Sequence, residues 1–131
     1  MAEAEIRDIL NGYVQAWTGG DLATLMACYH DDFVLHYFGA NALTGTHVGK
    51  AAALGVLGEF SRRTARQLLG TPAVLAGADR GVILAREKLG VDAAAVEVDR
   101  VLVYTVADSR LRECWVYDAD QAMIDRLIGS A

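Results

Sequence analysis

The sequence contains little cysteine and little histidine, and each shortage narrows the chemistry that the chain can perform. Its two cysteines, Cys28 and Cys114, lie far apart and belong to no CxxC or Cys/His pattern, so neither a disulfide framework nor a zinc site is expected. The three histidines also lack the spacing of metal ligands. We therefore expect no metal ion, and two free thiols suit a reducing, cytoplasmic location.

Long apolar runs and clusters of positive charge are absent as well. No stretch approaches the roughly 18 apolar residues of a membrane span, and the N-terminus is acidic, unlike that of a secretion signal. The net charge is −5 and the arginines are scattered, whereas nucleic-acid binding needs a concentrated positive face. A phosphate-binding loop, a dinucleotide fingerprint and a nucleophile elbow are also lacking. We expect no membrane partner, no nucleic-acid partner and no cofactor.

The sequence is rich in apolar residues for its length. It has 131 residues, of which 53% are hydrophobic, and a single proline, Pro72. A chain of this size buries about two-thirds of the surface that its unfolded form exposes, which is enough for a core without metals or disulfides. Residues 1–131 are therefore predicted to form one domain with room for one pocket.

Helical periodicity dominates the first half of the chain. Apolar residues at steps of three and four predict an amphipathic helix with one buried stripe, made of Ile6, Ile9, Leu10, Tyr13, Val14 and Trp17. Gly19 and Gly20 end this helix, and Asp21 caps a second one, whose inner face would carry Leu22, Leu25, Met26 and Tyr29. A loop over 43–50 precedes a third helix over 51–64, and a short helix closes the chain near 123–128.

Strand-like segments fill the rest of the sequence. A β-branched and aromatic run over 33–38 predicts a strand, and turn-like separators divide the region beyond Arg66 into four further strands. These strands would cover 66–77, 81–90, 94–106 and 110–118. Three N-terminal helices and a curved antiparallel sheet form an α+β arrangement, with a cavity where the helices do not quite meet the sheet.

Several motifs in this order resemble one superfamily. They are Tyr13-Val14-Gln15-Ala16-Trp17, then Gly20-Asp21-Leu22, Asp31-Asp32-Phe33, the glycine loop from Gly45 to Gly49, and Arg110-Leu111-Arg112-Glu113 before Trp115. This pattern is similar to the nuclear transport factor 2-like superfamily, and within it to ketosteroid isomerases and SnoaL-like polyketide cyclases. The resemblance implies a cone-shaped, cystatin-like fold with an apolar pocket.

The resemblance also implies catalytic positions. Tyr13 matches the oxyanion-binding tyrosine of ketosteroid isomerases. The position of their proton-abstracting aspartate falls on His36 when counted from Gly39, and on Tyr37 when counted from the first glycine turn; we prefer His36, since imidazole titrates near neutrality. Asp99 is the candidate for a second oxyanion donor. The alternative for Tyr13 and His36 is a structural role in the core, and for Asp99 a solvated carboxylate or an ion pair.

Other residues are expected to shape the pocket. Strand alternation places Glu113, Trp115 and Tyr117 on one face, and with Trp17, Tyr29 and Glu87 they form the expected substrate-binding set. In SnoaL-like cyclases an acid/base residue follows soon after the tryptophan. Here Val116 follows Trp115, and Asp118 is displaced from that position by two residues. The Asp-Arg-Asp arrangement of limonene epoxide hydrolases has no clear match, because Asp99 and Arg100 would face opposite sides of a regular strand.

These observations lead to one preferred function and several alternatives. The preferred one is a cofactor-independent isomerase, cyclase or lyase that performs acid/base chemistry on a small apolar, cyclic or polyketide-like molecule. The alternatives are a non-catalytic ligand-binding or protein-assembly module, and an epoxide hydrolase. A homodimer is also expected, formed through an outer sheet face that would carry Leu102, Arg112, Cys114 and Val116.

Overall fold

The computed structural model describes residues 2–130, in which helices come first and most of the strands later. The elements follow in the order α1 (Ala2–Gly19), α2 (Leu22–Ala27), β1 (Tyr29–Tyr37), β2 (Gly45–Val48), α3 (Lys50–Thr64), β3 (Gln67–Ala76), β4 (Gly81–Leu89), the 3-10 turn η1 (Asp92–Ala94), β5 (Val96–Ala107), β6 (Arg110–Asp118) and α4 (Gln121–Ile128). None of the helices within residues 2–130 has the length and apolar character needed to cross a membrane.

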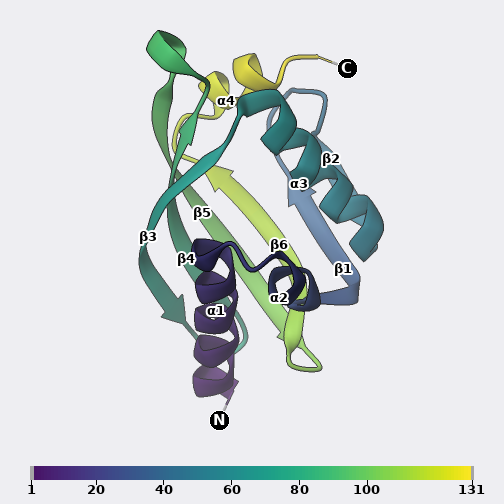
Figure 1. Ribbon diagram of the computed structural model, residues 1–131. Helices are drawn as coiled ribbons and strands as arrows, with labels where there is room; N and C mark the ends of the chain where they lie inside the picture. The colour runs from purple at the N-terminus through teal and green to yellow at the C-terminus, as the bar shows by residue number, and fades with distance from the viewer. Residues whose placement is uncertain (1, 131) are drawn as a thin grey trace.

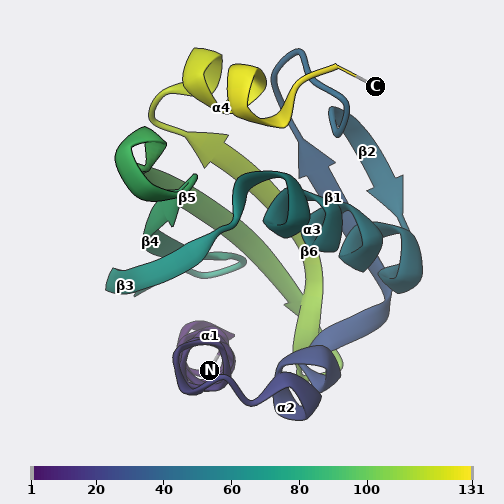
Figure 2. The ribbon, with the colours of Figure 1, turned by 45° about the horizontal axis from the view of Figure 1, so that its top comes forward.

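The strands form one mixed, curved sheet in the order β2-β1-β6-β5-β4-β3. The central pair β1 and β6 is parallel, and the other pairs are antiparallel. Helices α1 and α3 lie against the concave face, α2 lies beside α1 at one end, and α4 lies near the other end (Figures 1 and 2). The predicted α+β class is confirmed, and the concave face together with the helices encloses an interior space.

The two N-terminal helices follow their sequence signals closely. The buried residues of α1 recur at helical spacing, namely Ile6, Leu10, Tyr13 and Ala16, and they direct the apolar stripe toward the sheet. Asp21 caps α2 by accepting a hydrogen bond from the backbone N–H of Thr24 at 3.2 Å, which satisfies one of the open donors of the first turn. The α1–α2 connection follows closely on Trp17, which lies in the last turn of α1 and faces the interior space.

Two local predictions were wrong. Tyr29 does not lie on the second helix but begins β1, so the strand starts four residues earlier than expected. The expected loop over 43–50 contains the short strand β2, because Thr46 and Val48 pair antiparallel with His36 and Val34. The edge strand has only four residues, too few for its alternation to be recognised in the sequence.

A β-bulge on β6 reverses the expected orientation of its later side chains. Thr105 pairs with Glu113, but the next residue, Val106, pairs with Leu111, so Arg112 is an extra residue on β6. A slip of one residue moves every following side chain to the other face of the sheet. Alternation counted from Leu111 is therefore correct only up to the bulge.

The bulge has direct consequences for the expected dimer surface. Leu102, Cys114 and Val116 are buried on the concave side, so they cannot form an outer surface. The outer face instead exposes aromatic residues such as Phe38 and Tyr117. The homodimer stays a prediction, and sedimentation at micromolar concentration is expected to give twice the 14.1 kDa chain mass; a purely monomeric species would contradict it.

The contact between α1 and β4 depends on a glycine. A Cβ at Gly81 would lie 2.4 Å from Leu10 Cδ1 and 2.8 Å from Ile6 Cγ2. Gly81→Ala is therefore expected to lower the free energy of unfolding by about 1–3 kcal/mol, the usual cost of overpacking, as measured by urea denaturation. Gly12→Ala is the matched control, because a Cβ there meets nothing within 4 Å and alanine is the better helix former; equal stability of both variants would contradict this packing.

Candidate functional site

A cavity of about 270 Å³ lies between the concave face of the sheet and helices α1, α2 and α3. Its volume is slightly below the roughly 300–1,000 Å³ of pockets for drug-sized ligands, so it suits a smaller molecule. The lining is mostly apolar and includes Leu22, Leu25, Met26, Phe33, Leu35, Leu54, Leu57, Leu102 and Val116. Polar groups enter it in two separate places.

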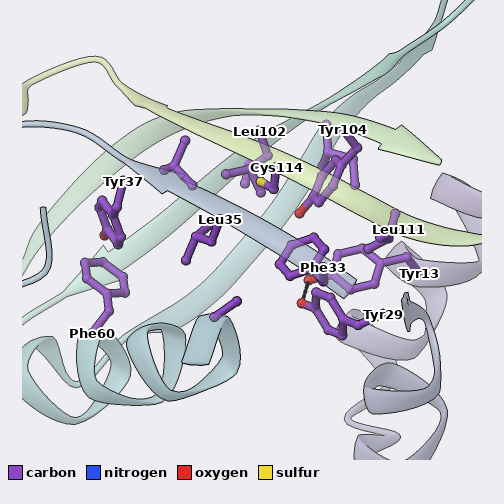
Figure 3. Packing of buried hydrophobic residues seen from close by; sticks show 14 of the residues in the cluster. Tyr13, Tyr29, Phe33, Leu35, Tyr37, Phe60, Leu102, Tyr104, Leu111 and Cys114 are labelled. Atoms are coloured by element: carbon purple, nitrogen blue, oxygen red, sulfur yellow. Dashed lines mark hydrogen bonds between the residues drawn. The ribbon is translucent and has the colours of Figure 1, made fainter. Parts of the chain in front are cut away.

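Three tyrosines and a cysteine form one polar end of the cavity. The hydroxyls of Tyr13 and Tyr29 are hydrogen-bonded to each other, and the ring of Tyr104 packs edge-on against Tyr13 at 5.8 Å between centroids (Figure 3). Burial raises the pKa of Tyr13 and of the Cys114 thiol to about 12 each. These groups are therefore neutral hydrogen-bonding partners near neutral pH.

Arginine and carboxylate side chains form the other polar end. The Arg100 guanidinium donates to Asp118 at 2.6 and 3.2 Å and to the Tyr37 hydroxyl at 2.7 Å, and it lies 4.3 Å from the ring centroid of Phe60. Burial alone would lower the pKa of Arg100, but Tyr37, Asp118 and Glu87 raise it above its usual value. Arg100 is therefore a permanent, firmly held cation.

Glu87 is the least satisfied group of this end. Its side chain is 1% exposed and lies 3.3 Å from Arg66 Nε and 3.6 Å from Arg100 Nη1. Within the part of the chain that the structure describes, neither carboxylate oxygen accepts a hydrogen bond. Because an unsatisfied buried carboxylate is costly, these two oxygens are available to a hydrogen-bond donor or a proton in the cavity.

The two polar ends are connected by the inward face of β5. Arg100, Leu102 and Tyr104 are buried on the same face of this strand, and the four residue steps from Arg100 to Tyr104 correspond to roughly 13 Å. Figure 3 shows Tyr37 and Phe60 at one side of the core and Tyr13 and Tyr29 at the other. A ligand that reaches both ends must therefore span most of the cavity.

Four of the expected site residues line this cavity. Tyr13 and Trp17 reach it from α1, Tyr29 from the start of β1, and Glu87 from near the end of β4. Their location agrees with the expected inward orientation.

The preferred candidate base, His36, lies elsewhere. Strand β1 buries Phe33, Leu35 and Tyr37 on its inner face, so His36 points outward by alternation. There it is hydrogen-bonded to Glu113 and stacks on Trp115 at 5.0 Å between ring centroids. The expectation that His36 is a base in the cavity is corrected, and so is the inward placement of Glu113 and Trp115.

Asp99 and Tyr117 also lie outside the cavity. Asp99 is on the outer face of β5, where it accepts a hydrogen bond from exposed Arg86 at 2.9 Å. Tyr117 is 48% exposed and stacks on Phe38. Neither residue can therefore bind or stabilise a molecule inside the cavity.

Sequence reasoning missed the groups that surround Glu87. Arg66 and Arg100 line the cavity beside Glu87, and Asp118 and Tyr37 are bonded to Arg100. One signal was available for Arg100: apolar residues two positions away on both sides, Val98 and Leu102, share its strand face. An arginine in such a position is either exposed on an apolar face or buried with partners, and it is buried here.

The positions of the two tryptophans lead to a testable difference. Trp17 lines the cavity, whereas Trp115 lies on the outer face with Arg80 over its ring at 5.2 Å. A non-absorbing bicyclic ketone such as 2-decalone is expected to change the fluorescence of Trp115→Phe as it does that of the unaltered protein. Trp17→Phe should lose this response. A response that disappears in Trp115→Phe and persists in Trp17→Phe would place the ligand on the outer face.

Within residues 2–130, no group of three or more histidine, cysteine, aspartate or glutamate side chains is arranged to hold a metal ion. The ionisable groups of the cavity are instead paired with each other, as Arg100 with Asp118. The chemistry that these residues can supply by themselves is therefore proton transfer, hydrogen bonding and charge stabilisation.

Comparison with known proteins agrees with this architecture. The sequence model described as SnoaL-like domain matches residues 10–114, whereas no curated protein matches the sequence significantly. The structure resembles Bal32a from a soil-derived mobile gene cassette, with a TM-score of 0.85 and 18% identity over 98% of this chain and 99% of that one.

Two further solved structures show the same fold. A protein of unknown function with a cystatin-like fold from Xanthomonas campestris has a TM-score of 0.83 and 24% identity, covering 93% of this chain and 96% of that chain. A candidate polyketide cyclase from Xanthomonas campestris pv. campestris has a TM-score of 0.75 and 14% identity, covering 97% and 99% of the two chains.

Proposed function

Because the chain belongs to the SnoaL-like domain family, we propose that it transfers a proton within a small, largely apolar cyclic molecule, as an isomerase or cyclase does. Glu87 is the acid/base group, and no cofactor takes part. The similarity to a candidate polyketide cyclase supports this class of reaction.

The observation that carries the proposal is the state of Glu87. It is a fully buried carboxylate in an apolar cavity, and both of its oxygens lack a hydrogen-bonding partner within residues 2–130. Such a group is rare in a core that serves only stability, because it is costly. A carboxylate held in this way can take a proton from a carbon atom beside a carbonyl and return it at another position.

The other polar groups of the cavity complement this role. Arg66 lies 3.3 Å from Glu87, so its charge can stabilise the negative charge that develops on the carbonyl oxygen beside the reacting carbon. Tyr13 and Tyr29 are neutral donors at the other polar end, where they can hydrogen-bond a second polar group of the molecule. Arg100 is a positioning residue, because it is bound to Asp118 and Tyr37 and holds its charge 3.6 Å from Glu87 Oε2. The apolar wall excludes water from the reacting atoms.

An exchange assay with a model compound tests the proposal. 2-Tetralone is a bicyclic ketone with acidic protons beside its carbonyl, and in heavy water these protons exchange measurably by NMR. The protein is expected to accelerate the exchange above the buffer rate, in proportion to protein concentration. Binding of 2-tetralone without any acceleration would contradict the proposal and favour a non-catalytic binding module.

Epoxide hydrolysis is the second candidate, and one observation favours it. Glu87, Arg100 and Asp118 form an acid-arginine-acid series across β4, β5 and β6, which resembles the Asp-Arg-Asp arrangement of limonene epoxide hydrolases. In that reaction one carboxylate takes a proton from water, the water oxygen bonds to an epoxide carbon, and an acid protonates the released oxygen. Asp118, however, is bound by Arg100 at two oxygens and is not among the residues that line the cavity.

The two candidates are separated by one comparison. Incubation with cyclohexene oxide in heavy-oxygen water would give a labelled diol if the protein is an epoxide hydrolase. Proton exchange of 2-tetralone with no diol formation is the result expected from the preferred proposal. Diol formation without exchange would replace it by the second candidate.

A further inference from the structure

Arg66 has a different environment from the other arginine of the cavity. It lies two residues after the end of α3 and lines the cavity next to Glu87. Its guanidinium carbon lies 5.7 Å from the ring centroid of Trp17 and 5.3 Å from that of Phe60. Two aromatic rings thus hold the planar group in place. Its side chain is 20% exposed, compared with 2% for Arg100, so Arg66 lies toward the mouth of the cavity.

Within residues 2–130, the Arg66 guanidinium forms an ion pair with Glu87 but donates no hydrogen bond. Arg100 donates hydrogen bonds to Asp118 and Tyr37. Arg66 instead lies 3.3 Å from Glu87, whose oxygens accept no hydrogen bond within residues 2–130. An arginine presents five N–H donors in a fork that fits a carboxylate. The Arg66–Glu87 ion pair is thus close but lacks a hydrogen bond, which points to a site where a third group binds.

The positive charge of Arg66 also extends over much of the cavity. It lowers the pKa of Tyr13 and Tyr29 at one end and of Tyr37 at the other, in each case against the larger, opposite effect of burial. An anion bound at Arg66 would therefore lie in a positive potential that extends through the cavity. The partial exposure of Arg66 lets such an anion keep part of its hydration, which reduces the cost of binding it.

We propose that Arg66 is the anion-binding group of the site, and that the natural ligand is a small carboxylic acid whose apolar ring occupies the cavity. The inference rests on the proposed function only in using this cavity as the ligand site. The carboxylate would receive hydrogen bonds from the Arg66 fork at the mouth. The ring would lie among the leucines and Val116, with Glu87 beside it.

Calorimetric titration with a matched pair of bicyclic probes tests this assignment. 2-Naphthoate is charged at neutral pH, and 2-naphthamide has nearly the same shape but no charge. The unaltered protein is expected to bind 2-naphthoate about 10- to 100-fold more tightly, the range typical of hydrogen bonds to charged groups. Equal affinity for the two probes, or no binding of 2-naphthoate at millimolar concentration, would overturn the proposal.

Variants of Arg66 test whether this residue causes the preference for 2-naphthoate over 2-naphthamide. Arg66→Gln is expected to lose the preference by weakening 2-naphthoate alone, and Arg66→Lys should keep a smaller preference, because lysine retains the charge without the fork. Arg62→Gln is the control, since Arg62 is 70% exposed and bound to Glu59 on α3. A full preference for 2-naphthoate in Arg66→Gln would overturn the proposal. If that variant fails to fold, Arg66→Lys and the unaltered protein decide the outcome.

Glu87→Gln separates this inference from the proposed function. Removing the negative charge 3.3 Å from Arg66 Nε should tighten the binding of 2-naphthoate and leave that of 2-naphthamide unchanged. The same variant should exchange the protons of 2-tetralone more slowly if the proposed function holds. Tighter anion binding with undiminished exchange would therefore retain the anion site and reject Glu87 as the acid/base group.

Discussion

Glu87→Gln is expected to slow the protein-catalysed proton exchange of 2-tetralone by about 100- to 10,000-fold, the usual contribution of a positioned acid/base group. Glutamine has nearly the same shape and remains able to hydrogen-bond, but it cannot accept a proton at neutral pH. Glu87 is buried between Arg66 and Arg100, so no carboxylate from solvent can take its place. The exchange rate measured by NMR gives the effect directly.

The outer face of the sheet provides matched controls for this variant. Glu113→Gln removes the same charge from a carboxylate that is hydrogen-bonded to His36 outside the cavity, and His36→Asn removes the imidazole. Both variants are expected to exchange protons at the rate of the unaltered protein. A large loss in either of them, together with full activity of Glu87→Gln, would move the reaction to the outer face.

Asp118→Ala is expected to lower the free energy of unfolding by about 3–5 kcal/mol, the cost of removing one partner from a buried ion pair. Asp118 and Arg100 are 1% and 2% exposed at their side chains, and two hydrogen bonds of 2.6 and 3.2 Å connect them. Without the carboxylate, the guanidinium would remain buried with a permanent charge. Chemical denaturation monitored by circular dichroism measures the loss.

An aspartate on the opposite face of the sheet serves as the control for stability. Asp99 is paired with Arg86, but their side chains are 64% and 44% exposed. Exposed ion pairs contribute about 0–1 kcal/mol, so Asp99→Ala should cost little. Similar losses for Asp118→Ala and Asp99→Ala would show that the Arg100 pair does not have the buried character described above.

The order of the elements could be predicted from local patterns. The stripe from Ile6 to Trp17 and the separators at Gly90 and Asp108 determine where helices and strands begin and end, because periodicity and turn residues act locally. The start of β1 at Tyr29 and the short strand β2 were not predictable in this way. Both depend on pairing with distant residues, such as Tyr29 with Leu111.

The site was predicted only where helix geometry or undisturbed strand alternation fixes a side chain. Tyr13 and Trp17 follow from the apolar stripe of α1, and Glu87 from regular alternation along β4. The bulge at Arg112 reversed the faces on which the later side chains of β6 lie. On β1, apolar or aromatic residues occur on both faces, so hydrophobicity alone did not show whether His36 or Tyr37 points inward.

The charged end of the cavity required three-dimensional information. Arg100 is buried only because Asp118 from β6, Tyr37 from β1 and Glu87 from β4 surround it. These partners lie 13 to 63 positions away from Arg100 along the chain, and no local sequence pattern connects them to it. A single sequence therefore favours the solvated interpretation of such an arginine, which is the common case.

A crystal structure with bound 2-naphthol tests the central claim most directly. This planar phenol resembles the enolate that proton removal from 2-tetralone would form. The account predicts that its ring lies in the cavity between the sheet and α3, with a ring atom within roughly 3.5 Å of a Glu87 carboxylate oxygen. Its hydroxyl is expected to contact Arg66, which lies 3.3 Å from Glu87. Binding of 2-naphthol on the outer face beside His36 and Trp115, with the cavity closed by its own side chains, would contradict the account.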